Sequence, residues 1–441
     1  MRDGKIYRQI NNSYQKEYDY LINSGLYNSL VNAELLIPHK EVDIPPEDHE
    51  IAYKIIKPEV IPFISYPYEF CFRQLKDAAL ITLKVQKMSL QYGMTLKDAS
   101  VYNIQFRNGK PIFIDTLSFE KYEEGRPWVA YRQFCQHFLA PLTLMRYKDV
   151  RLNQLFKIHL DGIPLNLASS LLPFFTKFIP SILIHIHIHA YSQRYFANKN
   201  VNIRGKNIRF ISHLGLIDNL ESFIKKLTWR SFRTEWINYY KNQIYSVDAF
   251  QHKKQIISDY LDRIKPKQVW DLGANTGVFS RVASEKGIET ISFDIDPGAV
   301  EKNYIECINR NEKKILPLII DITNPSPAIG WENRERLSFI ERGPTDAVLA
   351  LAIIHHLAIS NNLPFENISN FFSKLCKYLI IEYIPKNDIQ VKGLLKTRKD
   401  IFHNYDQENF EQKFGRDFKI QISERICNSD RILYLMKAKN M

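Results

Sequence analysis

At 441 residues the chain exceeds one ordinary domain, so the sequence predicts two. Hydrophobic residues make up 45% of the chain and charged residues 24%, which excludes a disordered or fibrous protein and is typical of a globular one. The formal net charge of +12 fits either a solubilising surface or an anionic partner, which would be an anionic substrate, nucleic acid or an anionic membrane surface.

Three further features bear on location and partners. Five scattered cysteines without a Cys-x-x-Cys pair indicate neither a zinc site nor a disulfide framework, and they fit a reducing compartment. The first residues, Met-Arg-Asp-Gly-Lys, lack the apolar core of a signal peptide, so we expect a cytoplasmic protein. No recognisable nucleic-acid-binding module is present.

Residues 94–119 combine a polar pattern with a hairpin. Asp98 and Asn103 have the Asp-x-x-x-x-Asn spacing of a kinase catalytic loop. Arg107-Asn108-Gly109-Lys110 predicts a tight β-turn, and the second strand of the hairpin ends at Asp115. The local alternative is a hairpin in which Asp98 and Asn103 serve only as caps.

This segment resembles the catalytic core of the protein-kinase-like and aminoglycoside-phosphotransferase-like superfamily. The resemblance implies that Asp98 is a base and that Asn103 and Asp115 hold Mg²⁺ for ATP. However, Leu96 replaces the histidine usual in that loop, and residues 1–60 contain no glycine-rich loop. A kinase-derived domain that binds a substrate or partner is therefore as well supported as an active kinase.

The most apolar stretch, residues 171–189, is interrupted by two prolines and a lysine, and falls short of a membrane span. We expect buried helices, with a membrane-surface hairpin, and hence peripheral membrane contact, as the alternative. His185, His187 and His189 would share one face of a strand and could there bind a metal, but on a helix they would not converge.

Residues 269–280 predict a strand, a tight glycine turn and the start of a helix. Asp271 precedes the turn, and Gly273 and Gly277 lie within it. Glycine suits a turn with strained backbone angles and a closely approaching ligand, and the helix N-terminus offers free N–H groups. Asp294, at the end of the next predicted strand, can accept both hydroxyls of a ribose.

Three interpretations of this turn remain open. It is a structural unit without a ligand, a dinucleotide site, or a methyl-donor site. The Gly-x-Gly-x-x-Gly spacing of dinucleotide folds is absent. The segment resembles motif I of class I S-adenosylmethionine-dependent methyltransferases, with Asn275 in place of the middle glycine. Asp271 fits this resemblance because a carboxylate attracts the cationic methionine moiety and would repel a pyrophosphate.

Strands and helices alternate through the rest of the C-terminal half, which indicates a parallel sheet covered by helices on both faces. Five such strands closed by a hairpin are a feature of the methyltransferase fold. We therefore expect an α/β protein with a Rossmann-like seven-stranded sheet. The expected elements are strands at 289–293, 315–321, 346–352, 378–384, 418–422 and 431–436, and helices at 299–309 and 368–377.

The resemblance implies a set of cofactor ligands. Asp271 and the turn of Gly273, Asn275 and Gly277 would hold the methionine part of S-adenosylmethionine. In the same way, Asp294 would bind the ribose hydroxyls.

Other acids near these strand ends leave alternatives. Asp296 is the alternative ribose ligand, because the sequence reads Asp-Ile-Asp there. Asp321 would lie near the adenine amino group. Each acid could instead cap a helix or a turn.

His355 and His356 follow the fourth strand, where the methyl acceptor should bind. Either histidine could deprotonate an acceptor hydroxyl, and the alternative is that both pack or cap. Methyl transfer to a good nucleophile needs only positioning.

Over most of its length the chain resembles a bacterial family of class I methyltransferases related to host-specific nodulation proteins. Aromatic residues in 234–240, and the following Lys253-Lys254, precede the core in the region that commonly covers the cofactor in this fold; ordinary helix packing is the alternative. The matching runs are Ile64–Glu69, Lys97–Phe119, Trp128–Leu142, Thr234–Tyr240, Val269–Arg281 and Ala350–His356.

The resemblance implies two domains, a kinase-like one at 1–230 with a helical C-lobe and a methyltransferase at 231–441. The expected activity is methyl transfer from S-adenosylmethionine to a glycan, lipid-linked sugar or small metabolite. ATP and Mg²⁺ belong only to an active kinase-like domain. The alternatives are a bifunctional kinase-methyltransferase and a non-catalytic cofactor-sensing interaction module.

Overall fold

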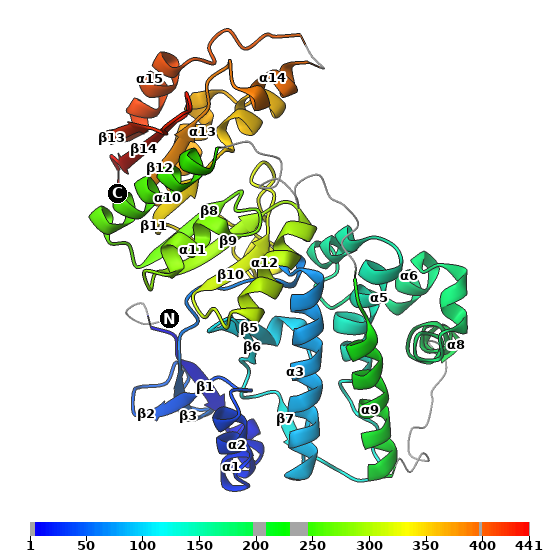
Figure 1. Ribbon diagram of the computed structural model, residues 1–441. Coiled ribbons are helices and arrows are strands. Elements are labelled where there is room, and N and C mark those ends of the chain that lie inside the picture. Colours follow the sequence, from blue (N-terminus) through cyan, green and yellow to red (C-terminus); the bar gives the residue numbers. More distant parts are fainter. Residues whose placement is uncertain (1–4, 197–208, 230–245, 397–398, 441) are drawn as a thin grey trace. The chain divides into compact units, whose positions relative to one another are not determined.

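The computed structural model describes residues 5–196, 209–229, 246–396 and 399–440. The chain divides into two compact units, Met1–Arg230 and Ser231–Met441 (Figure 1). Among the described helices, none combines the length and the apolar character that crossing a bilayer requires.

The N-terminal unit begins with a small antiparallel sheet in which β3 lies between β1 and β2. Ile10 and Ile56 of this sheet form a buried cluster with Tyr14 and Tyr18, because the following helix lays its aromatic side chains against the strands. The strands of this sheet are β1 (Arg8–Asn11), β2 (His39–Val42) and β3 (Ala52–Pro58).

Two further strand pairs follow the long helix of this unit. β5 (Ile104–Arg107) pairs with β6 (Lys110–Phe113) through a two-residue turn in which Asn108 and Gly109 have φ of 52° and 74°. Two successive positive φ angles give the turn that matches strand twist, so the predicted hairpin is confirmed. β4 (Met94–Leu96) pairs with β7 (Phe119–Lys121).

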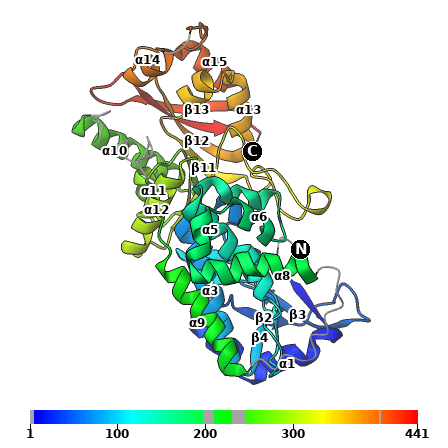
Figure 2. The same cartoon turned by 90° about the vertical axis from the view of Figure 1, so that its right-hand side faces the viewer.

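Helices make up the rest of the N-terminal unit. α3 and α9 lie side by side (Figures 1 and 2), and Lys87 of α3 forms ion pairs with Asp218 and Glu221 of α9. The α-helices in the described part of this unit are α1 (Gln15–Asn23), α2 (Leu26–Asn32), α3 (Phe72–Gln91), α4 (Tyr131–Phe134), α5 (Ala140–Tyr147), α6 (Leu165–Leu171), α7 (Pro180–Ile182), α8 (His189–Phe196) and α9 (Phe210–Lys226).

The histidine-rich stretch is helical. α7 continues through a π-helical turn, η7 (Leu183–Ile188), into α8, so the strand that would align the three histidines does not form. His185 contacts Tyr131 and Asn219, whereas His187 contacts a serine and a threonine. Their ring nitrogens therefore serve separate packing contacts and do not converge on one point.

The C-terminal unit is built on one seven-stranded sheet of order β10-β9-β8-β11-β12-β14-β13. The five strands from β8 to β12 are parallel, and β14 runs antiparallel to both of its neighbours. The α/β class expected from the alternating elements is confirmed. The strands are β8 (Gln268–Leu272), β9 (Glu289–Asp294), β10 (Ile315–Ile319), β11 (Thr345–Ala350), β12 (Cys376–Tyr383), β13 (Phe418–Arg425) and β14 (Ile432–Ala438).

Helices cover both faces of this sheet, which explains why its inner strands are almost entirely buried. Leu433 and Leu435 of β14 join a core with α10 and α11. Tyr434, between them, points to the opposite face and contacts Phe410 of α15. The helices are α10 (Val247–Ile264), α11 (Val278–Ser284), α12 (Pro297–Asn309), α13 (Phe365–Leu375), α14 (Ile389–Leu395) and α15 (Gln407–Asp417).

Several boundaries differ by a few residues from the sequence prediction, most clearly the one between α13 and β12. The helix expected at 368–377 begins at Phe365 and ends at Leu375, and Cys376 already belongs to β12. Pro364 precedes the helix and provides the change of backbone direction at its start. The strand begins earlier than expected because it pairs in register with β11 from Thr345 onward.

Candidate functional site

A cavity of about 360 Å³ lies at the carboxyl ends of β8, β9, β10 and β11. β8 lies at the centre of this edge, where the connections β8-β9-β10 run to one side and β11-β12 run to the other. Ligands of open parallel sheets bind at such a reversal of strand order. The polar and charged side chains on the cavity wall include Lys253, Asp271, Asn275, Asp294, Asp321 and His356.

The turn after β8 leaves no room for a side chain at either of its two glycines. Gly273 and Gly277 have φ of 74° and 75°. A Cβ atom on Gly273 would lie 2.4 Å from Ile353 Cγ2, and one on Gly277 would lie 2.4 Å from Asn303 Oδ1. Both the backbone conformation and the close packing therefore require glycine. Asn275, with φ of 52°, is a residue that tolerates this region.

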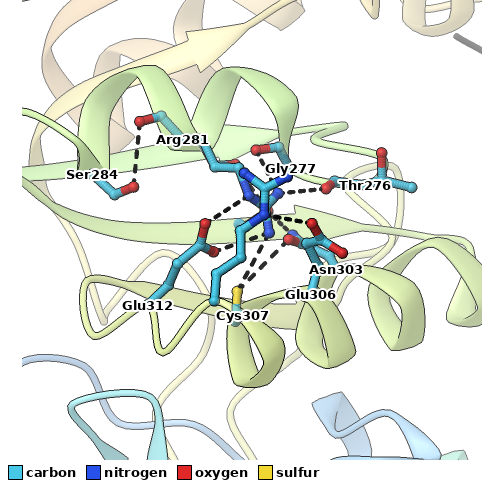
Figure 3. A network of polar contacts seen from close by, with 11 residues as sticks. Thr276, Gly277, Arg281, Ser284, Asn303, Glu306, Cys307 and Glu312 are labelled. Carbon is cyan, nitrogen blue, oxygen red and sulfur yellow. Dashed lines mark hydrogen bonds and ion pairs between the residues drawn. The ribbon is translucent and has the colours of Figure 1, made fainter.

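Arg281 of α11 stabilises the turn by hydrogen bonds to its backbone (Figure 3). Its Nη1 donates to the carbonyl oxygens of Thr276 at 2.7 Å and Gly277 at 3.0 Å. Its Nε and Nη2 donate to the two carboxylate oxygens of Glu312 at 2.9 and 3.0 Å. A bidentate pair of this kind fixes the guanidinium plane, so Arg281 positions the turn although it does not line the cavity.

Asp271 lies on the cavity floor with 1% of its surface exposed. Ser280 Oγ donates to its Oδ2 at 2.6 Å. Burial raises the pKa of the Asp271 carboxyl to about 7, because a carboxylate loses hydration there. The site would therefore favour a cationic ligand group beside this side chain.

Asp294, at the end of β9, also lines the cavity. Its Oδ2 accepts from the backbone N–H of Asn275 at 2.7 Å, and its Oδ1 accepts from that of Asp296 at 2.8 Å. Burial raises the pKa of Asp294 to about 6. Asp296 instead caps α12 by accepting from the N–H of Gly298 at 2.8 Å. Of the two ribose candidates, the structure places Asp294 on the wall.

Asp321 follows β10 and lines the cavity from the side opposite β11 in the strand order. Its Oδ1 accepts from the N–H of Thr323 at 2.8 Å and from the hydroxyl of Thr323 at 2.6 Å. The carboxylate thus stabilises a local turn, as the capping alternative predicts, while also facing the cavity.

The structure separates the two adjacent histidines. His356 lines the cavity, whereas His355 is fully buried, and within the described residues neither of its ring nitrogens has a hydrogen-bond partner. Burial lowers the pKa of both imidazoles, that of His355 most strongly because His356 and Arg431 are also near. Both are therefore neutral near physiological pH. Ala352, with φ of 53°, turns the chain before them.

Lys253 of α10 is a site residue whose role the sequence did not reveal. Its Nζ lies 2.7 Å from Glu382 Oε2, and both side chains are at most 1% exposed. The ammonium also lies 4.4 Å from the ring centroid of Phe279. Burial lowers the pKa of Lys253, and the nearby Glu382 opposes that shift. Arg431 lies 3.7 Å from the other oxygen of Glu382.

A signal for Lys253 was present in the sequence. The buried residues of α10 fall on one helical stripe, and Lys253 occupies a position within it. A lysine among buried apolar positions needs a partner, and here the partner comes from β12. The other members of the stripe are Ala249, Ile256, Ile257, Tyr260 and Leu261.

In the N-terminal unit, the residues of the kinase-like pattern form hydrogen bonds with the backbone and with neighbouring side chains. Asp98 accepts from the N–H of Ser100 at 2.9 Å. Asn103 Nδ2 donates to Ser118 Oγ at 3.4 Å, and Ser118 Oγ donates to Asp115 Oδ2.

A cation of the chain itself already faces this pattern. Arg8 Nη1 lies 2.7 Å from Asp115 Oδ1, so this carboxylate already has a cationic partner within the unit. Among the residues that the structure describes, no group of three or more His, Cys, Asp or Glu side chains could hold a metal. In this arrangement Asn103 is bonded to Ser118, and Asp115 is paired with Arg8. The aromatic run Thr234–Tyr240 lies outside the described residues.

Five parallel strands, an antiparallel hairpin and acidic strand ends define an α/β domain of the methyltransferase type. Nodulation protein NoeA of Rhizobium meliloti (strain 1021) is 34% identical over 402 residues, which cover 89% of this chain and 84% of that protein. The chain therefore belongs to the family of this nodulation protein, and the family expected from the sequence is confirmed. No protein-family model matches the chain.

Solved structures with a similar arrangement include several that are described as methyltransferases. Magnesium protoporphyrin IX methyltransferase of Synechocystis PCC 6803 is 16% identical, with 46% of this chain and 97% of that chain covered and a TM-score of 0.32. The N-methyltransferase NodS of Bradyrhizobium japonicum WM9 is 11% identical, with 44% of this chain and 98% of that chain covered and a TM-score of 0.32. The bifunctional kinase-methyltransferase WbdD is 14% identical, with 46% of this chain and 42% of that chain covered and a TM-score of 0.30. Because these TM-scores are low, the fold assignment rests on the strand order and not on these structures.

Substitution of the turn glycines tests the packing argument. Gly273→Ala and Gly277→Ala are each expected to lose about 2 kcal/mol of stability, because backbone strain and a clash combine. Gly287→Ala is the matched control, since Gly287 has φ of 80° and a Cβ atom added to it would meet nothing within 4 Å. Urea unfolding followed by circular dichroism measures the difference. Equal losses in all three variants would contradict the close-packing argument.

Removal of the buried ammonium tests the charge pair. Lys253→Met should destabilise the C-terminal unit by about 3 kcal/mol, because it leaves Glu382 buried without its nearest cation. The double variant Lys253→Met/Glu382→Gln should recover most of that loss, since neither buried charge remains. Lys254→Met is the control on the same helix. Additive effects in the double variant, measured by urea unfolding, would show that the pair is not coupled.

Proposed function

We propose that this protein transfers a methyl group from S-adenosylmethionine to an unidentified acceptor, and that residues 231–441 carry this activity. The observation that carries the proposal is the position of Asp271, buried beside the glycine turn at the edge where strand order reverses. A cationic amine satisfies this carboxyl, and a pyrophosphate does not. The cavity volume of about 360 Å³ lies in the range of small-molecule sites.

The proposed ligand contacts follow from the cavity wall. Asp271 would face the amine of the methionine moiety. Lys253 is the one lysine or arginine among the described residues of the wall, and its ammonium, which carries three donors, would face the carboxylate. Asp294 would accept the ribose hydroxyls, and Asp321 would lie near the adenine. The amine and the carboxylate of the methionine moiety would thus each face a protein side chain of opposite charge.

The chemistry asked of the protein is modest. S-adenosylmethionine supplies an activated methyl group when it is bound. The apolar wall from Phe293 and Leu351 would exclude water, and the chain would hold the acceptor in line with that group. His356, which is neutral and on the wall, would accept the proton of an acceptor hydroxyl.

For the methyl acceptor we propose a chemical class. A glycan, a lipid-linked sugar or a small metabolite fits the proposal, and an anionic acceptor would be attracted by the net charge of +12. The family relative is a nodulation protein, which motivates a screen of carbohydrate acceptors. We propose a cytoplasmic location.

We further propose that the kinase-like unit, residues 1–230, binds the acceptor or a partner and does not transfer phosphate. The ion pair between Arg8 and Asp115 supports this, because the guanidinium already neutralises the carboxylate that would have to bind a metal ion. The bifunctional and the cofactor-sensing alternatives differ in their products. The first requires ATP turnover, and the second requires binding without methyl transfer.

Calorimetric titration with S-adenosylmethionine and S-adenosylhomocysteine tests the cofactor. Wild type should bind both at micromolar Kd, and Asp271→Asn and Asp294→Asn should each weaken binding at least about tenfold, since each loses a charged hydrogen bond. Asp296→Asn should bind normally, because asparagine also caps a helix. Absence of binding by folded wild type would sink the proposal, and loss of binding in Asp296→Asn alone would reassign the ribose contact.

The pH dependence of that affinity tests the role of Asp271. Its pKa of about 7 in the empty site should fall when a cation binds, so the ligand selects the ionised form. Affinity should therefore rise roughly tenfold between about pH 6 and about pH 7.5, and fall as pH is lowered through 7. Asp271→Asn should flatten the profile. A wild-type affinity independent of pH would contradict the proposed amine contact.

A further inference from the structure

Several large apolar side chains of the N-terminal unit face outward on one helical segment. Ile184, Ile188, Tyr191 and Tyr195 recur at intervals of four, three and four residues, which places them on one stripe of the helix from α7 to α8. Their exposed fractions are 51%, 51%, 69% and 53%. α8 crosses the near side of this unit in Figure 2.

Two phenylalanines that precede this stripe in the sequence are also exposed. The short helix η6 (Phe174–Phe178) precedes α7, and it exposes Phe174 by 69% and Phe178 by 75%. Single exposed apolar residues are ordinary, but a helical stripe of them is not. We name the apolar face by its six residues, Phe174, Phe178, Ile184, Ile188, Tyr191 and Tyr195.

The opposite side of the same helix is firmly packed, so the apolar face is not a misplaced core. Ile182 and Ile186 are fully buried. His185 contacts Tyr131 and Asn219 on its two ring nitrogens, at 2.7 and 3.0 Å. The inner side thus fixes the helix orientation, and the apolar face is left outward by that packing.

The stretch of sequence that carries the apolar face contains basic residues and no acidic ones. Between Asp161 and Asp218 the sequence contains six lysines and arginines and no aspartate or glutamate. Lys177 and Arg194 lie beside the apolar face and are exposed, and the Lys177 ammonium lies 5.0 Å from the ring centroid of Phe174. Basic side chains next to exposed aromatic and aliphatic ones are the pattern of helices that lie in a membrane interface.

We infer that the apolar face docks on the surface of an anionic lipid bilayer. The isoleucines and phenylalanines would enter the acyl boundary, and the tyrosines would lie at the headgroup level with their hydroxyls hydrated. Lys177 and Arg194 would contact anionic headgroups. The basic, acid-free stretch of sequence favours a lipid surface over a second copy of this chain, because two such basic faces would repel each other. The inference does not rest on the proposed methyl transfer.

Vesicle flotation of the full-length protein tests this inference. Wild type should float with vesicles of phosphatidylcholine containing about 30% phosphatidylglycerol, bind pure phosphatidylcholine much more weakly, and be released by salt. Phe178→Gln and Ile188→Gln should each weaken binding about tenfold, because each removes a buried apolar contact with the bilayer. Lys177→Glu should weaken binding only to the anionic vesicles.

A matched control separates the apolar face from general hydrophobicity. Ile158, in the same unit, is 74% exposed, close to the 75% of Phe178. Ile158→Gln should bind vesicles as wild type does. Circular dichroism should show that every variant is folded.

Three outcomes would overturn the inference. They are a wild type that does not float, an equal loss in Ile158→Gln, and a concentration-dependent dimer that Phe178→Gln abolishes without any change in flotation. The last result would assign the apolar face to a second copy of the chain.

Discussion

The close approach of backbone at the turn after β8 is the constraint on which the C-terminal unit depends. Gly273 fits against Ile353, from the segment after β11, and Gly277 fits against Asn303 of α12. The turn therefore joins three parts of the sheet edge at once. Arg281 donates to the carbonyl groups of Thr276 and Gly277, so the backbone of the turn is fixed beside the cavity.

Burial of charge gives the cavity its chemical character. Asp271 and Asp294 have raised pKa values because the sheet edge excludes water, and the ammonium of Lys253 is stabilised there by the ion pair with Glu382. Such groups are costly in an empty site, and a ligand of complementary charge relieves that cost. A stable fold alone would be served as well by apolar residues, so these charges point to recognition.

The N-terminal unit uses its polar and apolar residues differently. The residues of its kinase-like pattern are engaged with the chain itself, since Asp115 is paired with Arg8 and linked to Asn103 through a serine. Its outer helix instead leaves an apolar face toward solvent within an acid-free stretch. The described part of this unit thus combines a polar cluster that is paired within the unit with an exposed apolar face.

The sequence by itself determined the features that depend on local backbone geometry. Asn108-Gly109 specified a hairpin turn, and Gly273 and Gly277 specified the turn after β8, because few residues accept positive φ. Apolar runs specified buried parallel strands. The family was also recognisable from these motifs, as the relative confirms.

Only the tertiary structure decided which of several local candidates face the cavity. It placed Asp294 and His356 on the wall, gave Asp296 to a helix cap and buried His355. It also brought Lys253 to Glu382 across 129 positions of sequence. Neighbouring residues have the same local propensities, so their roles depend on how distant elements pack, and sequence spacing alone does not contain that information.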